Sequence, residues 1–210
     1  MLQKQNCSTC YSQSVSRRDD LLAAACDYVL THGLIGLSLR PLAAAVGTSD
    51  RMLIYHFGSR DQMVSAIIEE TIVRSVRVIE ALPSAPTPAD AVHRLWDLLQ
   101  AEPMRHHEDV YLQAAATGQL GEEPYRSAAR TANDVWCRAV EDWFARSGVA
   151  REDAPRVVRL VDAAFLGLHV NVTTDDASEI SSAIADIAAL VSRMAAVEAI
   201  GTSAGSGWAG

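Results

Sequence analysis

Apolar residues recur at helical spacing along almost the whole 210-residue chain, and this periodicity restricts the fold more than any other feature. Side chains three and four residues apart share one face of an α-helix, whereas a half-buried strand needs strict alternation, of which we find no convincing case. Breaks containing Gly, Ser or Pro separate the helical segments. The sequence therefore predicts an all-α protein of about nine helices, at Ser16–His32, Leu39–Val46, Asp50–His56, Arg60–Leu82, Ala89–Ala101, Pro103–Thr117, Pro124–Arg146, Ala154–Val172 and Ser178–Ile200.

The helix lengths suggest a small module followed by a larger domain. We expect a flexible tail over 1–14, a three-helix module over 15–60, a helical domain over 61–200 and a flexible Gly/Ser/Ala-rich tail over 201–210. The first 14 residues lack the apolar region of a secretory signal. No apolar run approaches the roughly 18 residues of a membrane span. We therefore expect a cytoplasmic protein with no membrane partner.

The sequence offers little for metal or redox chemistry. Cys7 and Cys10 form a CxxC pair, but a tetrahedral zinc site needs two more ligands and no second CxxC follows. The adjacent His106 and His107 point to different helix faces and cannot chelate one ion. We expect no metal and no cofactor, and we treat the CxxC as incidental. The alternative to an incidental CxxC is that this tail responds to redox state or to a metal. The protein would then be a helical sensor or scaffold with little sequence-specific DNA binding.

No catalytic residues are predicted either. The chain lacks a Gly-rich phosphate loop, a Gly-x-Ser-x-Gly elbow and a His-Glu-x-x-His pair, which are the motifs that would indicate common enzyme classes. We therefore expect that the protein is not an enzyme.

The net charge of −8 hides an uneven distribution along the chain. Residues 1–60 carry six basic and four acidic side chains, whereas the remaining 150 residues carry 12 basic and 22 acidic ones. An acidic body joined to a weakly basic module can still bind phosphates locally. The charge therefore does not exclude a nucleic-acid partner.

The segment from Ser38 to Phe57 has the pattern of a helix-turn-helix. Leu39–Val46 and Asp50–His56 are two short helices separated by Gly47-Thr48-Ser49, and Ser38 and Ser49 are good N-caps. Apolar residues are spaced to pack the two helices together: Leu42, Ala43, Val46 and Leu53. In such a motif the second helix enters the major groove of DNA.

The same region resembles the N-terminal signature of the TetR family. The stretch Gly36–Met63, GLSLRPLAAAVGTSDRMLIYHFGSRDQM, contains a Ser cap, a Leu-Ala pair, a Gly-Thr-Ser turn, a Tyr-His-Phe segment and a Ser-Arg followed by an apolar residue. The resemblance covers about 50 residues from Arg17. It implies a homodimeric regulator, most often a repressor, that binds a palindromic operator in double-stranded DNA and is released by a small-molecule effector.

The resemblance also implies roles for individual residues. Ser38 and Arg40 would meet phosphates, as would Arg60, which replaces the usual Lys, while His56 would contact the DNA backbone. The groove-facing residues would be Thr48, Ser49, Asp50, Arg51 and Met52.

Two of these groove-facing residues can be matched to bases. The fork of Arg51 suits O6 and N7 of guanine, and Met52 could touch a thymine methyl. Asp50 has two interpretations, because it could accept from a cytosine amine or stabilise the helix N-terminus.

One departure from the family pattern concerns its phosphate-binding tyrosine. That position aligns with Ile54, whereas the tyrosine here is Tyr55. Either Tyr55 takes over the phosphate contact, or it packs inside the three-helix module.

For the larger domain, the resemblance implies an effector pocket in the middle helices and an intersubunit four-helix bundle formed by the last two. Candidate pocket residues, each of which could instead be ordinary core, are Trp96, Met104, Tyr111, Trp136, Trp143, Phe165 and His169. Apolar faces that could form the dimer interface, or be buried within a monomer, contain Val157, Leu160, Val161, Ala164, Phe165, Leu168, Ile180, Ile184, Ile187, Val191 and Met194.

Overall fold

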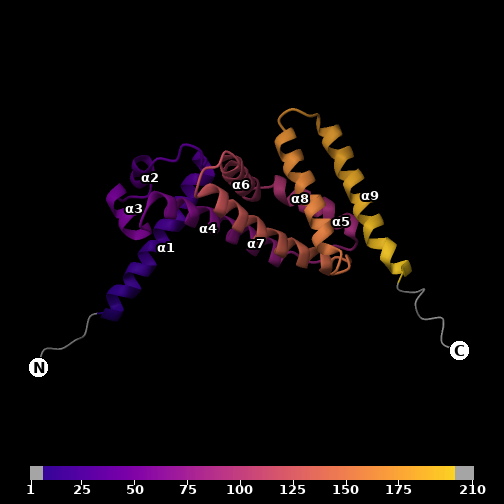
Figure 1. Ribbon diagram of the computed structural model, residues 1–210, viewed down its shortest axis with the longest axis horizontal. Helices are drawn as coiled ribbons and strands as arrows, with labels where there is room; N and C mark the ends of the chain where they lie inside the picture. Colours follow the sequence, from indigo (N-terminus) through magenta and orange to yellow (C-terminus); the bar gives the residue numbers. More distant parts are fainter. Residues whose placement is uncertain (1–6, 202–210) are drawn as a thin grey trace, which may run out of the picture. The chain divides into compact units, whose positions relative to one another are not determined.

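The computed structural model describes residues 7–201, with side chains described from Arg17 to Ala196. Within this range all regular structure is helical (Figure 1). The predicted all-α fold is therefore confirmed, and each expected helix is present within a few residues of its predicted ends, except at the start of α1. The helices are α1 Cys7–His32, α2 Leu39–Ala45, α3 Asp50–Phe57, α4 Arg60–Ala81, α5 Pro88–Gln100, α6 Met104–Gln119, α7 Tyr125–Arg146, α8 Ala154–Asn171 and α9 Ala177–Gly201.

The first helix corrects the expected N-terminal boundary. α1 begins at Cys7 rather than Ser16, so residues 7–14, which we expected in the N-terminal tail, belong to this helix. No Gly or Pro lies between Cys7 and Arg17, so nothing in the backbone chemistry ends the helix there. The expected tails at 1–6 and 202–210 lie outside the described residues.

The helices group into two compact units. Unit 1 contains the chain up to Arg74 together with His106–Ala132, and unit 2 contains Ser75–Arg105 and the chain from Asn133 onward. The contacts therefore group residues differently from the expected boundary at residue 60. The reason is that α6 and the first turns of α7 contribute apolar side chains to the core built by the N-terminal helices.

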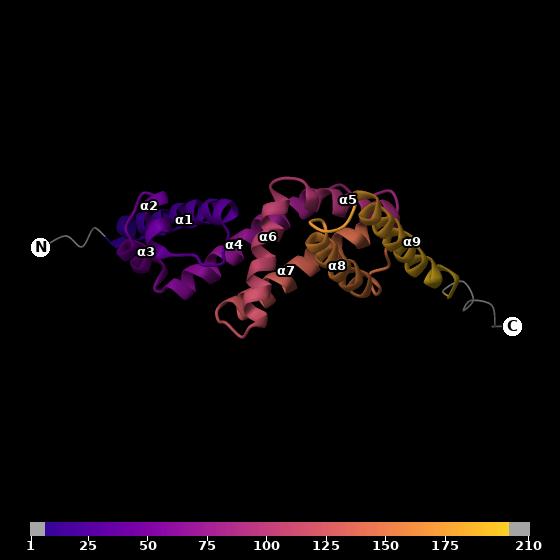
Figure 2. The same cartoon turned by 90° about the horizontal axis from the view of Figure 1, so that it is seen from above.

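Unit 1 has a continuous apolar core in which α1, α2, α3 and the first half of α4 meet (Figure 2). Gly33, with φ of +83°, ends α1 as predicted, because a left-handed conformation suits glycine. Fully or almost fully buried side chains of this core include Leu21, Ala25, Val29, Leu34, Leu42, Ala43, Leu53, Met63, Ile67 and Ala114.

Unit 2 is organised by α5, which packs along α9, and by the antiparallel pair α8 and α9 (Figures 1 and 2). Trp143 and Phe144 of α7 are fully buried here. Trp143 Nε1 donates to Pro83 O at 3.1 Å, and Ala85 N donates to Ser147 Oγ at 2.9 Å. These two bonds fix the Pro-rich turn before α5 onto α7.

The described helices include none that combines the length and the apolar character needed to cross a lipid bilayer.

Candidate nucleic-acid interface

The helix-turn-helix has the geometry expected from its sequence. α2 and α3 are joined by residues 46–49, where Gly47 has φ of +68° and Thr48 N donates to Ala43 O at 2.9 Å. A positive φ is strained for residues with a Cβ, so the turn requires glycine here. Leu42 and Leu53 are both completely buried, so each short helix is held by its apolar face. The opposite faces are left for solvent or DNA.

Only one of the two predicted caps of this motif forms. Ser49 Oγ accepts from Met52 N at 3.2 Å and so caps α3. Ser38 occupies the N-cap position of α2 with an extended backbone, but its hydroxyl makes no capping bond. The expected side-chain cap at Ser38 is therefore wrong, and that hydroxyl lies exposed.

The exposed face of α3 contains most of the predicted base-reading residues. Arg51, Met52 and Tyr55 are exposed, whereas Leu53 and Phe57 on the other face are buried. Tyr55 is 74% exposed, which excludes its packing inside the three-helix module. Of the two interpretations of Tyr55, only the one with an available hydroxyl agrees with the structure.

Two charged residues of this surface have no ion pair with a described residue, whereas a third, Asp50, accepts a local hydrogen bond. Arg40 and Arg51 are exposed, and neither forms an ion pair with another described residue. Asp50 Oδ1 accepts from Arg51 N at 2.9 Å, in the first turn of α3. This bond favours the interpretation in which Asp50 stabilises the helix N-terminus. Thr48 and His56 are partly buried at the two ends of α3, and Tyr55 and His56 pack edge to face.

Arg60 has intrachain contacts that the sequence did not indicate. Its Nη2 donates to Leu37 O at 3.1 Å and to Tyr125 Oη at 3.3 Å, and its Nη1 lies 3.7 Å from Asp61 Oδ1. The guanidinium therefore connects the start of α4 with the loop before α2 and with α7. Ser59 Oγ caps the same helix start by accepting from Gln62 N at 3.1 Å.

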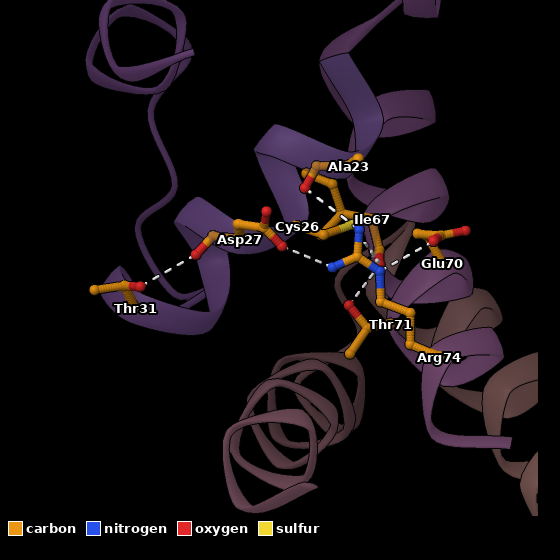
Figure 3. A network of polar contacts seen from close by, with 8 residues as sticks. All are labelled: Ala23, Cys26, Asp27, Thr31, Ile67, Glu70, Thr71 and Arg74. Carbon is orange, nitrogen blue, oxygen red and sulfur yellow. Dashed lines mark hydrogen bonds and ion pairs between the residues drawn. The ribbon is translucent and has the colours of Figure 1, made fainter. Parts of the chain in front are cut away.

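Two further arginines, Arg18 and Arg74, make contacts that hold α1 against α3 and α4. The Arg18 guanidinium carbon lies 5.1 Å from the centre of the Phe57 ring, so α1 contacts the end of α3 through a cation–π interaction. Arg74 of α4 binds α1, with Nη1 at 2.7 Å from Asp27 Oδ1 and Nη2 at 3.4 Å from Ala23 O (Figure 3). Neither contact had a recognisable sequence signal, because each joins residues about 40 or more positions apart.

The cysteines show no sign of reactivity in the described part of the chain. Burial raises the pKa of the Cys26 thiol to about 12 and that of Cys137 to about 11, so both stay protonated near neutral pH. Cys26 Sγ lies 3.8 Å from Ile67 O (Figure 3). Among the residues whose side chains are described, no cluster of His, Cys, Asp or Glu could hold a metal ion. Cys7 and Cys10 lie in the first turn of α1, and their side chains are outside the described set.

The seven candidate pocket residues do not form one group. Tyr111 lies in unit 1 and the other six lie in unit 2. Trp143 and Met104 are buried as core residues. The remaining four lie on three helices of unit 2: Trp96 on α5, Trp136 on α7, and Phe165 and His169 on α8.

Two side-chain contacts involve members of this smaller group, and one of them includes the partly buried carboxylate of Asp162. The rings of Trp96 and Phe165 meet edge to face, with centroids 5.2 Å apart. Trp136 Nε1 donates to Asp162 Oδ1 at 3.1 Å, and burial raises the pKa of Asp162. Asp162, Phe165 and His169 are spaced to lie on one side of α8. Sequence reasoning missed Asp162, because a single acidic residue in a helix is usually solvated.

A groove of about 440 Å³ lies elsewhere, within unit 1, between the end of α1 and α6. None of the seven candidate pocket residues lines it. Its lining comes from two short segments: Val29, Leu30, Thr31, His32, Gly33, His106, Asp109, Val110, Leu112 and Gln113.

Most of the candidate dimer residues face the inside of their own chain. Buried positions within unit 2 are Val157, Val161, Phe165, Ile180, Ile184 and Val191. These six fit the second of the two interpretations, burial within a monomer, because helical periodicity identifies a buried face without saying what buries it. Leu160 is exposed, and the remaining four are partly buried: Ala164, Leu168, Ile187 and Met194.

Comparison with known proteins agrees with this geometry. The family model of the tetR family of bacterial regulatory proteins matches residues 21–67, which contain the end of α1, all of α2 and α3, and the start of α4. The chain carries the DNA-binding domain of the TetR family. That family consists of transcription regulators, not of enzymes.

One curated relative gives a longer match to this TetR-type chain. The HTH-type transcriptional repressor KstR2 of Mycolicibacterium smegmatis is 27% identical over 124 residues, which are 58% of this chain and 60% of the repressor. The aligned part thus spans less than two thirds of that relative.

Solved structures show that the TetR-type fold extends over most of the chain. A putative TetR-family transcriptional regulator from Rhodococcus sp. has a TM-score of 0.64 and 20% identity, covering 84% of this chain and 98% of that one. The multidrug binding protein EbrR complexed with proflavin has a TM-score of 0.63 and 21% identity, covering 83% and 99%. EbrR has also been solved with ethidium.

Proposed function

We propose that this chain is a ligand-responsive transcription repressor that binds a palindromic operator as a homodimer and is released by a small-molecule effector. The observation that carries the proposal is the exposed face of α3, where Arg51, Met52 and Tyr55 project from a helix whose opposite face is buried. The similarity of the chain to the repressor KstR2 supports repression rather than activation.

The proposed DNA contacts divide into base reading and phosphate binding. Arg51 reads guanine through its guanidinium fork, and Met52 contacts a thymine methyl. Thr48 and Ser49 approach the groove at the start of α3. Phosphates are held by four residues around the motif: Ser38, Arg40, Tyr55 and His56.

Arg60 contributes less to phosphate binding in this proposal than the family resemblance implies. Its Nη2 is engaged by Leu37 O and Tyr125 Oη, so a phosphate would be reached only by the remaining exposed part of the guanidinium. Asp50 supports the start of α3 rather than a base, because its carboxylate accepts from Arg51 N.

The proposed dimer uses the exposed sides of α8 and α9. Apolar and small residues remain on those sides, and they can approach a second copy closely: Leu160, Ala163, Gly167, Val170, Ala185, Ala189 and Leu190. Dimerisation would allow two copies of α3 to reach successive major grooves, which lie roughly 34–36 Å apart on one side of the duplex.

We further propose that the effector is a small organic cation bound beside Asp162 in unit 2. Asp162 has no ion pair with a described residue and accepts from Trp136. Phe165, one turn further along α8, and Trp96, which contacts Phe165, add aromatic rings to this part of unit 2. A bound cation would offset the cost of burying the carboxylate and could stack on the rings. The similarity of the fold to EbrR, which has been solved with proflavin and ethidium, supports this class of ligand.

Release from DNA is proposed to proceed through α4, the continuous helix Arg60–Ala81. Effector binding would displace α4 and change the separation of the two DNA-reading modules of the dimer. Such coupling requires the effector to bind the DNA-free conformation more tightly than the DNA-bound one.

The test of DNA binding is an in vitro selection of bound genomic fragments at a stated salt concentration, repeated with Arg51→Ala. We expect the wild type to enrich a near-palindrome, and the variant to lose base preference at one position of each half-site, with a cost of about 1–3 kcal/mol. Arg77→Ala, at an exposed position of α4, is the matched control. No enrichment by the wild type at low salt would overturn the proposal.

A further inference from the structure

The connector between α1 and α2, residues Gly33–Ser38, determines how the helix-turn-helix begins. Gly33 and Gly36 have positive φ values of +83° and +75°, so two left-handed residues reverse the chain within six positions. Inside the connector, one backbone bond runs from Leu37 N to Leu34 O at 3.2 Å. The remaining polar groups must find partners elsewhere or be solvated.

A side chain of α6 supplies partners for two of these groups. Gln113 Oε1 accepts from Leu34 N at 2.6 Å and from Ile35 N at 3.0 Å, across 79 and 78 residues of sequence. Leu34 is completely buried, so its amide needs an acceptor in the protein. A Cβ added at Gly33 would lie 3.0 Å from the same oxygen, which shows how closely Gln113 approaches the connector.

The other end of the connector is held by α4 and α7. Leu37 O accepts from Arg60 Nη2 at 3.1 Å, and the same nitrogen lies 3.3 Å from Tyr125 Oη. Ser38, the next residue, makes no side-chain cap on α2. The start of α2 is therefore oriented by bonds that come from outside the helix-turn-helix.

We propose that Gln113 is a positioning residue for operator binding, whose carboxamide oxygen holds the α1–α2 connector, and with it α2 and α3, in the orientation that DNA requires. The proposal rests on the function proposed above. In this proposal Gln113 itself does not contact DNA, because its carboxamide oxygen is engaged by the connector. Its effect on binding is exerted through the backbone of Leu34 and Ile35.

The test compares Gln113→Met with wild type on the operator fragment that the wild type selects and on a fragment of unrelated sequence. Methionine keeps the length and apolar stem of the side chain but accepts no amide bond of comparable strength. We expect the variant to bind operator about tenfold more weakly, equivalent to about 1.4 kcal/mol. Binding to the unrelated fragment should change less, because the exposed charges of Arg40 and Arg51 are unaltered.

Two controls separate positioning from a general loss of structure. Gln113→Glu keeps an acceptor oxygen at the same distance and should restore operator affinity. Gln119→Met makes the same replacement at an exposed position of the same helix and should leave affinity unchanged. Amide hydrogen exchange should become faster at Leu34 and Ile35 in Gln113→Met, with the core of α1 still protected. If that variant fails to fold, Gln113→Asn, one methylene shorter, replaces it.

The outcomes are distinct. A wild type that binds no DNA would overturn the proposed function and the positioning role together. If the wild type binds, equal operator affinity of Gln113→Met would overturn the positioning role alone. The positioning role would also be overturned if Gln119→Met weakened operator binding as much as Gln113→Met does. It would be overturned too if Gln113→Met lost the same affinity for the operator and for the unrelated fragment.

Discussion

Trp136 Nε1 donates a hydrogen bond of 3.1 Å to Asp162 Oδ1 in unit 2. This bond satisfies the indole N–H and lowers the pKa of the carboxyl, but burial has the larger effect, and the net pKa lies above its usual value of 3.8. The structure therefore partly buries an acid whose charged form accepts one hydrogen bond from a neutral donor and has no ion pair with a described residue. Two consequences of this pair can be measured separately, one for stability and one for ligand binding.

The first prediction concerns stability against pH. Because the folded-state pKa of Asp162 is raised, its contribution to the free energy of unfolding is fully present below the usual value of 3.8 and is lost as pH rises through the folded value. Asp162→Asn cannot ionise and still offers an oxygen to Trp136. Urea unfolding between pH 4 and roughly pH 7 should show the variant gaining stability relative to wild type as pH rises.

The control for this prediction is Asp186→Asn, an exposed position on α9. It should leave the pH dependence of unfolding as it is in the wild type. Parallel pH profiles for Asp162→Asn and wild type would contradict the prediction.

A second prediction concerns the ion-pair network that joins α4 to α1. Arg74 binds Asp27 at 2.7 Å and Glu70 at 3.0 Å, and its own side chain is 24% exposed (Figure 3). Asp27 is largely solvated, which screens the interaction. Arg74→Met should therefore lower the free energy of unfolding by about 1–2 kcal/mol, measured by urea titration.

Arg77→Met, at an exposed position three residues further along the same helix, should cost almost nothing. A double-mutant cycle with Asp27→Asn should return a measurable coupling energy between positions 27 and 74. A zero coupling energy would show that the 2.7 Å contact adds nothing to stability.

The third prediction tests whether Tyr55 replaces the tyrosine expected one position earlier. Its side chain is 74% exposed, so Tyr55→Phe should leave the unfolding temperature unchanged. If the hydroxyl binds a phosphate, operator affinity should fall about three- to tenfold, the range expected for one hydrogen bond. Fluorescence anisotropy at fixed salt would measure it.

Tyr28→Phe is the control, because Tyr28 lies on α1 and stacks on His32, outside the helix-turn-helix. Unchanged operator affinity for Tyr55→Phe would show that the hydroxyl makes no energetically useful contact with DNA.

The sequence predicted local structure well where local chemistry decides it. Gly33 and Gly47 have the positive φ values that end one helix and turn into another, and Ser49 caps α3 as its side chain suggests. The sequence does not decide whether Tyr55 is exposed or buried. A shift of one residue rotates a side chain by about 100° around a helix, and only tertiary packing fixes which side is buried.

Contacts between residues far apart in the chain could not be predicted from the sequence patterns. Gln113 and Leu34 are 79 positions apart, and nothing about a glutamine in an amphipathic helix indicates that it accepts from a distant connector. The buried faces of α8 and α9 were equally ambiguous: Val161 and Ile184 pack within the chain, although the same periodicity would fit a dimer interface. Asp162 was overlooked for a related reason, since its burial depends on α7.

The last prediction tests the proposed class of effector with ethidium as the probe. If Asp162 anchors an organic cation, ethidium should bind the wild type and lower its affinity for operator DNA. Asp162→Asn removes the charge but keeps the shape, so ethidium binding measured by fluorescence should weaken about tenfold to a hundredfold, the range for loss of one charge-assisted bond. Operator binding without ethidium should stay as in the wild type, and Asp186→Asn should bind ethidium normally. If Asp162→Asn binds ethidium as well as the wild type does, Asp162 is not the anchor. If the wild type binds operator but does not bind ethidium, the effector is not an aromatic cation of the ethidium type.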